Sequence, residues 1–451
     1  MEVMALLIAL GILVILSFSG ISMLIVAPFT VAVLALLSGD MPILTALTGP
    51  FMTSTMNYVR DFFLIFLGGA LFGKIMGQTG AARSLALFIA QKLGKERAML
   101  AVVLATAVLT YGGVSLFVAV FAIFPLAKAL FAEADIPKRL IPGAIALGAF
   151  TFTMTALPGT PQSINALPTN ILGTTIFAAP ILGTIGAIII FGVGMLWLNM
   201  RVRQAKKLGE GYGETIENLA VNPNEKSMSV VLAILPLVTI FLVNLALTFL
   251  FKQASVVAYF APFGGVNNTW SLILALLVGI LLSLFLYRKE IGGRSALLHL
   301  VNQGAESSLS PIFNTALIIG FGGVVRQTAA FALFRDAVMG LAIPGLYKVA
   351  IASSAIAGIT GSSSGGAGIA LEALGSEFLA MGIDPQAIHR VMLVSAGGLD
   401  SLPHCGAVVT LLAVCGVSSR KGYLDVGVTT VVGPVLASLT MIIVYNTFGI
   451  V

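Results

Sequence analysis

Long apolar runs alternate with short polar connections along this chain. About ten of the runs are apolar enough to predict membrane-spanning helices, although several are shorter than the roughly 20 residues of a full span. They cover residues 4–16, 21–37, 62–76, 141–156, 174–200, 230–251, 271–287, 312–325, 388–399 and 426–448. Two further apolar stretches, at about 95–136 and 344–384, are too long for one helix and are interrupted in the middle. The pattern predicts an all-α polytopic membrane protein in which these two stretches form re-entrant helical hairpins.

Both interruptions are rich in glycine and hydroxyl side chains. The first reads Thr-Tyr-Gly-Gly-Val-Ser at 110–115, and the second reads Thr-Gly-Ser-Ser-Ser-Gly-Gly at 360–366. Each predicted hairpin is followed by an apolar run that contains proline at a second break, at 157–162 and at 400–406. Irregular backbone at membrane depth is tolerated only where it is buried in protein or lines a cavity. The four breaks therefore predict a binding site.

The order of these features is the same in the two halves of the chain. It predicts two repeats, 1–200 and 228–451, joined by the polar linker 201–227. Basic residues crowd the start of this linker, so the positive-inside rule places it in the cytoplasm. Counting crossings outward from it inverts the second repeat relative to the first and places both termini in the periplasm of a bacterial inner membrane. Most of the 24 Lys and Arg residues then face the cytoplasm, and the exceptions are Arg60, Lys252, Arg326, Arg335, Lys348 and Arg390.

Composition supports this class. The 451 residues are 58% hydrophobic and only 9% charged. The excess of basic residues lies mainly in loops and at helix ends, so the lipid bilayer, and not a nucleic acid, is the expected partner. Only two cysteines are present, so neither a disulfide framework nor a metal-ligand cluster is expected. No Walker-type phosphate loop is present, and no cofactor is expected.

The four breaks supply the candidate substrate-binding groups. Free amides at half-helix N-termini attract anions, and nearby hydroxyls add hydrogen bonds. Proline 161 and proline 403 are expected where new helices begin. No Arg or Lys lies within the tips, so the prediction is a small carboxylate bound without a buried cation. The candidates are Thr110, Tyr111, Gly112, Gly113, Ser115, Gly159, Thr160, Gln162, Thr360, Ser362, Ser363, Ser364, Gly365, Gly366, Ser401 and His404.

Three ionisable residues near the second tip are candidates for proton coupling: Asp400, His404 and Glu372. Ionisable groups inside a membrane are costly and often relay protons. The alternative is that Asp400 caps the following half-helix and that His404 only hydrogen-bonds to backbone. A sodium site built from carbonyls and hydroxyls of the tips is a further alternative. His389 lies near an expected helix end and is interpreted as interfacial.

Three segments bring a known family into view: Gly-Ala-Leu-Phe-Gly-Lys at 69–74, the first tip at 110–113, and the Gly/Ser segment 360–368. Together they resemble the gluconate permease (GntP) family of the ion transporter superfamily. This resemblance implies proton-coupled import of gluconate and related hydroxy acids. It also implies a homodimer in which a transport domain, formed by the hairpins and broken helices, moves as an elevator against a scaffold.

One segment differs from the family pattern. Gluconate transporters carry a Ser-His-Val-Asn-Asp-Pro-like break in the last repeat, whereas this chain has Ser-Leu-Pro-His-Cys-Gly-Ala at 401–407. Only His404 is carried over. The difference points to a less hydroxyl-rich monocarboxylate than gluconate, with 3-hydroxybutyrate as the first candidate.

The sequence thus predicts a secondary transporter, not an enzyme, that imports a small hydroxy-monocarboxylate with protons. A sodium-coupled organic-anion symporter is the main alternative. A passive channel and an intramembrane hydrolase are two others. The hydrolase would use Ser115 or a serine of 362–364 as nucleophile and His404 as base.

Overall fold

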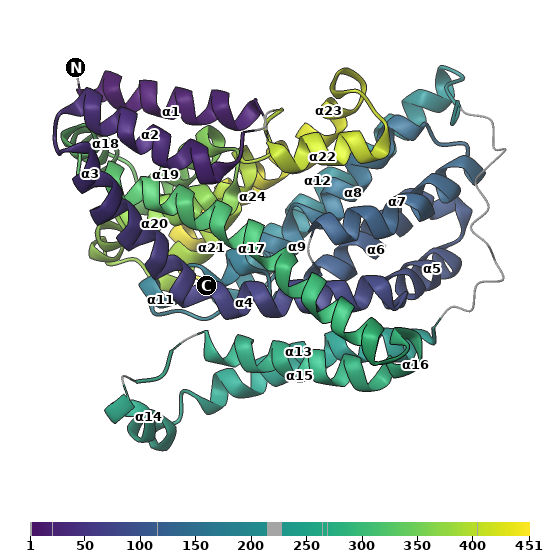
Figure 1. Ribbon diagram of the computed structural model, residues 1–451. Helices are drawn as coiled ribbons and strands as arrows, with labels where there is room; N and C mark the ends of the chain where they lie inside the picture. The colour runs from purple at the N-terminus through teal and green to yellow at the C-terminus, as the bar shows by residue number, and fades with distance from the viewer. Residues whose placement is uncertain are drawn as a thin grey trace.

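The computed structural model describes residues 2–19, 21–114, 116–213, 228–263, 265–267, 269–403 and 405–451. Every regular element in these ranges is a helix, which confirms the predicted all-α class (Figure 1). Within the described part of the chain, four helical segments are long and apolar enough to cross a membrane: Pro180–Lys207, Val230–Leu250, Arg294–Val325 and Ser419–Phe448.

The first half of the chain runs through two apolar helices into one long helix, a short amphipathic helix, a helical hairpin, a broken helix and a final long helix. These are α1 (Glu2–Phe18), α2 (Met23–Ser38), α3 (Ile43–Ala46), α4 (Met52–Gln78), α5 (Ala81–Leu93), α6 (Ala98–Tyr111), α7 (Leu116–Glu133), α8 (Ile141–Ala149), α9 (Phe152–Thr155), α10 (Ser163–Ala166), α11 (Thr169–Leu172) and α12 (Pro180–Lys207).

The second half passes through its elements in the same order. They are α13 (Val230–Leu250), α14 (Ala254–Phe260), α15 (Trp270–Leu286), α16 (Arg288–Ile291), α17 (Arg294–Val325), α18 (Ala329–Met339), α19 (Gly345–Thr360), α20 (Ser363–Ala380), α21 (Pro385–Leu399), α22 (Gly406–Cys415), α23 (Ser419–Gly427) and α24 (Gly433–Phe448).

The long helices α4 and α17 pack along each other through the middle of the molecule. The pair α13 and α15 forms a separate layer, in which α15 packs on α4 and α13 packs on α5 (Figure 1). The helix pair α6–α7 lies on the right in Figure 1, and the pair α19–α20 lies on the left. Between them, α8 and α21 are buried almost along their whole length. These two helices lead into the breaks.

The helix pairs α6–α7 and α19–α20 occupy the stretches that the sequence marks as hairpins, with turns at Gly112–Val114 and Gly361–Ser362. Their re-entry into a membrane stays a prediction. The apolar runs 62–76 and 312–325 are the later parts of the longer helices α4 and α17.

The first broken helix differs from the prediction. The run 141–156 was expected to be helical throughout, but α8 ends at Ala149, and Thr151 adopts non-helical backbone angles. The hydroxyls of Thr151 and Thr153 donate to the carbonyls of Leu147 (2.6 Å) and Gly148 (2.8 Å). Threonines that bond back to preceding carbonyls bend helices. The irregular segment therefore starts before the proline that was expected to cause it.

The prolines do not begin the new helices either. After the first break α10 begins at Ser163, and after the second α22 begins at Gly406, so Pro161 and Pro403 lie in the preceding turns. The final helix of the first half, expected from residue 174, begins at Pro180. A long non-helical stretch between α9 and α12 thus lies inside the protein, broken only by two single turns of helix, and its backbone polar groups need partners.

Candidate functional site

The second tip is a tight turn between α19 and α20. Gly361 ends α19 with φ +60°, a conformation that favours glycine. The Ser362 hydroxyl accepts a hydrogen bond from the Gly365 N–H (3.1 Å) and so caps α20. A Cβ on Gly366 would overlap the Cα of Ala357, so Gly366 allows the two arms to pack closely. These residues shape the tip, and Gly366 meets the opposite arm of its own hairpin.

Asp400 ties the second broken helix to this tip. It lies at the end of α21, is 9% exposed, and accepts a hydrogen bond from the Ser401 hydroxyl (2.7 Å). Ser363, the first residue of α20, lies beside this carboxylate. No Lys or Arg among the described residues forms an ion pair with it. Asp400 therefore lies at the N-terminal end of α20, and the alternative that it caps the following half-helix α22 is wrong, because Cys405 holds that position.

Glu372 does not join Asp400. It is on α20, nine residues after Ser363, which corresponds to about 13 Å along a helix. Its carboxylate accepts a hydrogen bond from the Ser54 hydroxyl of α4 (3.2 Å) and lies 3.8 Å from the guanidinium of Arg326. The structure thus separates these two candidates for proton coupling.

The remaining candidates of the second tip are placed as follows. Ser364 is half-buried in the first turn of α20, and the Thr360 hydroxyl donates to the Ile356 carbonyl of its own helix (2.9 Å). Ser115 of the first tip and His404 of the second break lie outside the described residues, so their proposed roles stay predictions.

Gln162 joins the first tip to the first broken helix through hydrogen bonds. Its side-chain amide donates to the carbonyls of Thr110 (2.6 Å) and Val114 (3.1 Å), on either side of the turn. The Thr160 hydroxyl lies 3.5 Å from the Tyr111 carbonyl. A Cβ on Gly113, which has φ +95°, would lie 2.9 Å from Pro161. The polar groups of the first tip are thus largely bonded within the protein.

A cavity of about 400 Å³ lies where the first tip faces α13. Three of the candidate residues line it, together with apolar side chains of α13. They are Tyr111, Gly112 and Gly159, with Ile234, Leu237 and Phe241 among the α13 residues. The Tyr111 hydroxyl donates to the Pro158 carbonyl (2.8 Å), so its ring forms a wall of the cavity while its polar end is held by the broken helix. This side of the site is apolar.

Arg390 organises the irregular segment after α9. It is fully buried on α21, and all five of its N–H donors are used. Its guanidinium donates to the carbonyls of Thr155 (3.0 Å), Ile176 (3.3 Å) and Ala178 (2.7 and 3.2 Å) and to Oδ1 of Asn165 (3.0 Å). None of these acceptors is charged. A buried cation therefore lies beside the first break, although no Arg or Lys lies within the tips, and Arg390, which was counted among the basic residues on the side opposite the cytoplasm, lies in the core.

Asn165 is the second organiser. Its Nδ2 donates to the carbonyls of Thr160 (3.0 Å) and Ile176 (2.9 Å), while its Oδ1 accepts from Arg390 and lies 3.3 Å from Nε2 of His389. His389 is fully buried, and its Nδ1 lies 2.8 Å from the Thr174 hydroxyl. The interfacial placing of His389 is thus wrong, because α21 runs through the core and not along its edge.

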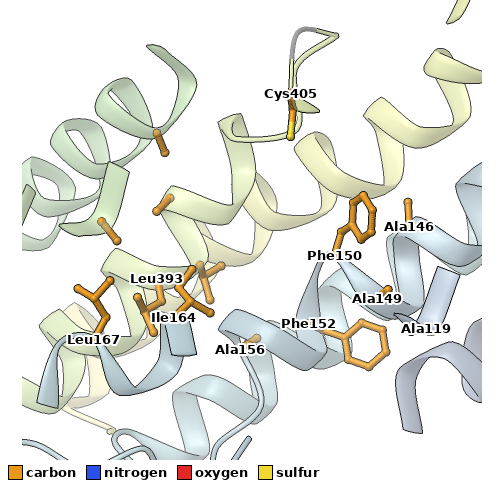
Figure 2. Close-up of a cluster of buried hydrophobic side chains, with 14 of the residues drawn as sticks. Ala119, Ala146, Ala149, Phe150, Phe152, Ala156, Ile164, Leu167, Leu393 and Cys405 are labelled. Atoms are coloured by element: carbon orange, nitrogen blue, oxygen red, sulfur yellow. The ribbon is translucent and has the colours of Figure 1, made fainter. Parts of the chain in front are cut away.

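The two breaks lie next to each other. A Cβ on Gly397, just before the second break, would lie 3.0 Å from Thr155 of the first. Figure 2 shows the apolar side chains around this junction, with Phe150 and Phe152 to one side of Ala156 and Ile164 and Leu167 to the other, the latter two beside Leu393 of α21. Both tips and both breaks therefore belong to one packed unit centred on α21.

Sequence reasoning missed Arg390, Asn165 and His389. The signal for Arg390 was present, because a basic residue near the start of an apolar run marks either a helix end or an intramembrane site of function. The predicted run 388–399 contains Arg390 close to its start, whereas the helix extends back to Pro385, so Arg390 lies further from the helix end than expected. Asn165 carries no comparable signal, since its importance depends on which carbonyls the fold leaves unpaired.

A charged cluster joins the turn before α8, α12 and α23 to the start of the linker. Asp425 is fully buried and accepts hydrogen bonds from Arg201 (2.8 Å), Arg139 (3.2 Å) and the Trp197 indole (3.0 Å). Arg139 also binds both carboxylate oxygens of Glu210 (2.7 and 2.8 Å). These hydrogen bonds lower the pKa of Glu210 below its ordinary value. The buried carboxylate of Asp425 thus forms ion pairs with both Arg139 and Arg201.

Comparison with known proteins agrees with this architecture. The model of the GntP family permeases matches residues 1–416. The chain is 39% identical, over the full length of both proteins, to the Bacillus subtilis (strain 168) protein named "Uncharacterized transporter YxjC". It is 29% identical to an "Uncharacterized transporter" of Haemophilus influenzae, over 75% of this chain and 74% of that protein.

Among solved structures, the Alcanivorax borkumensis YdaH transporter is similar in fold. The TM-score is 0.59 over 90% of this chain and 89% of that chain, at 14% sequence identity. The family excludes the intramembrane hydrolase that the serines and His404 had suggested. This protein is a multi-pass membrane transporter that belongs to the GntP permease family.

Proposed function

We propose that the protein imports a small hydroxy-monocarboxylate, 3-hydroxybutyrate or a gluconate-like acid, in symport with protons. The observation that carries this proposal is Asp400, a buried carboxylate at the junction of the second tip and the second broken helix. The Ser401 hydroxyl donates a hydrogen bond to this carboxylate, and no cation among the described residues pairs with it. Carboxylates in such positions relay protons in transporters.

Two observations support the substrate class. The guanidinium charge of Arg390 is balanced by no described carboxylate, and such a charge favours an anion nearby. The cavity at the first tip is lined mainly by apolar side chains. An apolar wall favours a short aliphatic part over a polyhydroxylated chain, because it leaves substrate hydroxyls unpaired. This supports 3-hydroxybutyrate ahead of gluconate.

We further propose that the two halves are inverted repeats and that transport follows an elevator mechanism. The support is the shared element order of the halves, since inverted repeats with broken helices are typical of secondary transporters. The packed unit around α21 would move, and the layer of α13 and α15 would belong to the scaffold. In this proposal the linker 201–227 is cytoplasmic, both termini are periplasmic, and the scaffold forms a homodimer in the bacterial inner membrane.

The test is uptake into proteoliposomes that contain the purified protein. A pH gradient, acid outside, is expected to drive accumulation of labelled 3-hydroxybutyrate, and a protonophore is expected to abolish it. Uptake that requires Na⁺ and ignores the protonophore would establish the sodium-coupled alternative. Uptake that never exceeds equilibrium would establish a channel. A thermal-shift screen against 3-hydroxybutyrate, gluconate, lactate, glycerate, D-serine and citrate at two pH values identifies the substrate.

A further inference from the structure

Two ionisable side chains of α21 are buried without an oppositely charged partner among the described residues. Arg390 is 0% exposed, and Asp400 is 9% exposed. They are ten residues apart on one helix, which corresponds to about 15 Å. Each is instead surrounded by neutral hydrogen-bonding groups. The packed unit therefore contains one positive and one negative side chain whose charges sum to zero. The two groups are too far apart to form an ion pair.

Among the described residues, the groups that face Asp400 are neutral. The titratable ones are the Cys405 thiol and the Tyr423 hydroxyl of α23, which donates to the neighbouring Ser401 carbonyl (3.2 Å). On α20, Glu372 contacts Ser54 and Arg326 instead. On α19, the Lys348 ammonium binds the Met339 carbonyl. No ionised side chain of the described part of these helices thus pairs with the carboxylate.

The groups that face Arg390 are neutral as well. His389 is the titratable neighbour on α21, and Tyr111 approaches from α6. Because Nδ2 of Asn165 donates to two carbonyls, its Oδ1 must accept, so Nε2 of His389 carries the proton there. Nδ1 is then free to accept from the Thr174 hydroxyl, which matches a neutral imidazole. Arg390 is the sole charge at this point of the described structure.

We propose that Arg390 and Asp400 make symport electroneutral and obligatory, with Arg390 as a fixed positive charge and Asp400 as the proton carrier. This inference rests on the proposed proton symport. In the empty form, Arg390 and ionised Asp400 sum to zero. In the loaded form, the carboxylate of Asp400 has taken a proton from the outer water, and a bound monoanion balances Arg390. The proton leaves to the inner water when the anion has gone.

Forms that carry only one of the two ligands are charged. A bound proton alone gives a net charge of +1, and a bound anion alone gives −1. An uncompensated charge inside an apolar medium is costly, so these forms cross rarely. Coupling then follows from charge balance and needs no separate gate. The same sum excludes a dianion, which leaves the loaded form at −1, and a neutral solute, which leaves it at +1. Monoanions are therefore the transported class.

The first experiment uses the wild-type protein in proteoliposomes. An imposed pH gradient is expected to drive uptake of 3-hydroxybutyrate, whereas a membrane potential imposed with potassium and valinomycin leaves the initial rate unchanged. A rate that rises with an inside-negative potential overturns the charge balance but leaves proton coupling intact. Dependence on Na⁺ overturns the proposed function itself. The two failures are thus distinguishable, and neither readout needs a variant.

The second experiment uses Asp400→Asn. An amide cannot carry the proton, so the empty form keeps the charge of Arg390, whereas the form with a bound monoanion stays neutral. Net uptake is expected to fall about 100-fold, while exchange of internal for external substrate persists and no longer depends on pH. Asp384→Asn at the other end of α21 is the matched control. Asp384 accepts a hydrogen bond from the Gln386 N–H (2.8 Å) and caps the helix, which asparagine does equally well.

Two results contradict the proposal. One is net uptake by Asp400→Asn at the rate of the Asp384→Asn control. The other is loss of exchange together with net uptake in an Asp400→Asn protein that melts at the same temperature as the control, because it would show that Asp400 binds substrate and does not merely carry the compensating charge.

Discussion

Asn165→Leu tests whether the irregular segment after α9 is held together by one amide. Leucine has a similar volume but neither donates nor accepts, so four interactions are lost: those with Thr160, Ile176, Arg390 and His389. Buried hydrogen bonds in membrane proteins average about 0.6 kcal/mol each, or about 2.4 kcal/mol together. The Arg390 donor left unpaired adds about 1–3 kcal/mol because it is charged. The expected destabilisation is about 4 kcal/mol.

The assay is thermal unfolding of purified protein in detergent. For a chain of 451 residues, about 1–2 °C is lost per kcal/mol, so the melting temperature is expected to fall by about 5 °C. Asn244→Leu on α13 is the matched control. Asn244 is buried, and both polar atoms of its amide lack a partner in the described structure. The same replacement there is expected to leave the melting temperature unchanged or to raise it. Equal losses in both variants would refute the role assigned to Asn165.

Two further predictions concern packing and charge. Gly366→Ala is expected to cost about 1–3 kcal/mol, because the added methyl group overlaps Ala357 on the opposite arm. Gly11→Ala, where nothing lies within 4 Å, is the control in the same thermal assay. The Glu210–Arg139 pair is expected to stabilise the protein above the unfolded pKa of Glu210 and to lose this effect as the pH falls through its lowered folded pKa. Melting curves between pH 7 and pH 3 check this, and Glu210→Gln should flatten that part of the profile; an unchanged profile would contradict the assignment.

The hydrophobic pattern was sufficient for the helical class and for the positions of the helix pairs α6–α7 and α19–α20, because apolar runs and glycine-rich turns act locally. It failed at the first broken helix. There the break begins at Thr151, where threonine hydroxyls bond to preceding carbonyls, and not at the proline. A threonine in a helix has no sequence signal that tells whether its hydroxyl will bend the backbone, since the surrounding packing decides it.

The location of the site was predictable from the sequence, but the hydrogen-bond partners of its residues were not. Glycine and serine marked the tips, and Asp400 was singled out by its depth in apolar sequence. The partners of these residues are distant in the chain: Gln162 bonds to Thr110 across 52 positions, and Arg390 to Asn165 across 225. Such contacts depend on the tertiary arrangement. The same limit explains Glu372, which shares a helix with the tip but turns toward α4.

The two tips differ in the groups that join each of them to its broken helix. In the first, Gln162 and Tyr111 bind backbone carbonyls, so the tip and its broken helix are already joined without a ligand. In the second, the Asp400 carboxylate accepts a hydrogen bond from Ser401 and lies beside Ser363 at the start of α20. A protonated carboxyl gains an O–H donor and accepts hydrogen bonds more weakly than a carboxylate, so its interactions with these two serines change. In the proposed proton symport, protonation of Asp400 would act on the start of α20, whereas the titratable group at the first tip, the Tyr111 hydroxyl, donates to the uncharged Pro158 carbonyl. In this proposal the second tip therefore links proton binding to the position of the hairpin, and the first tip forms the wall against which the substrate packs.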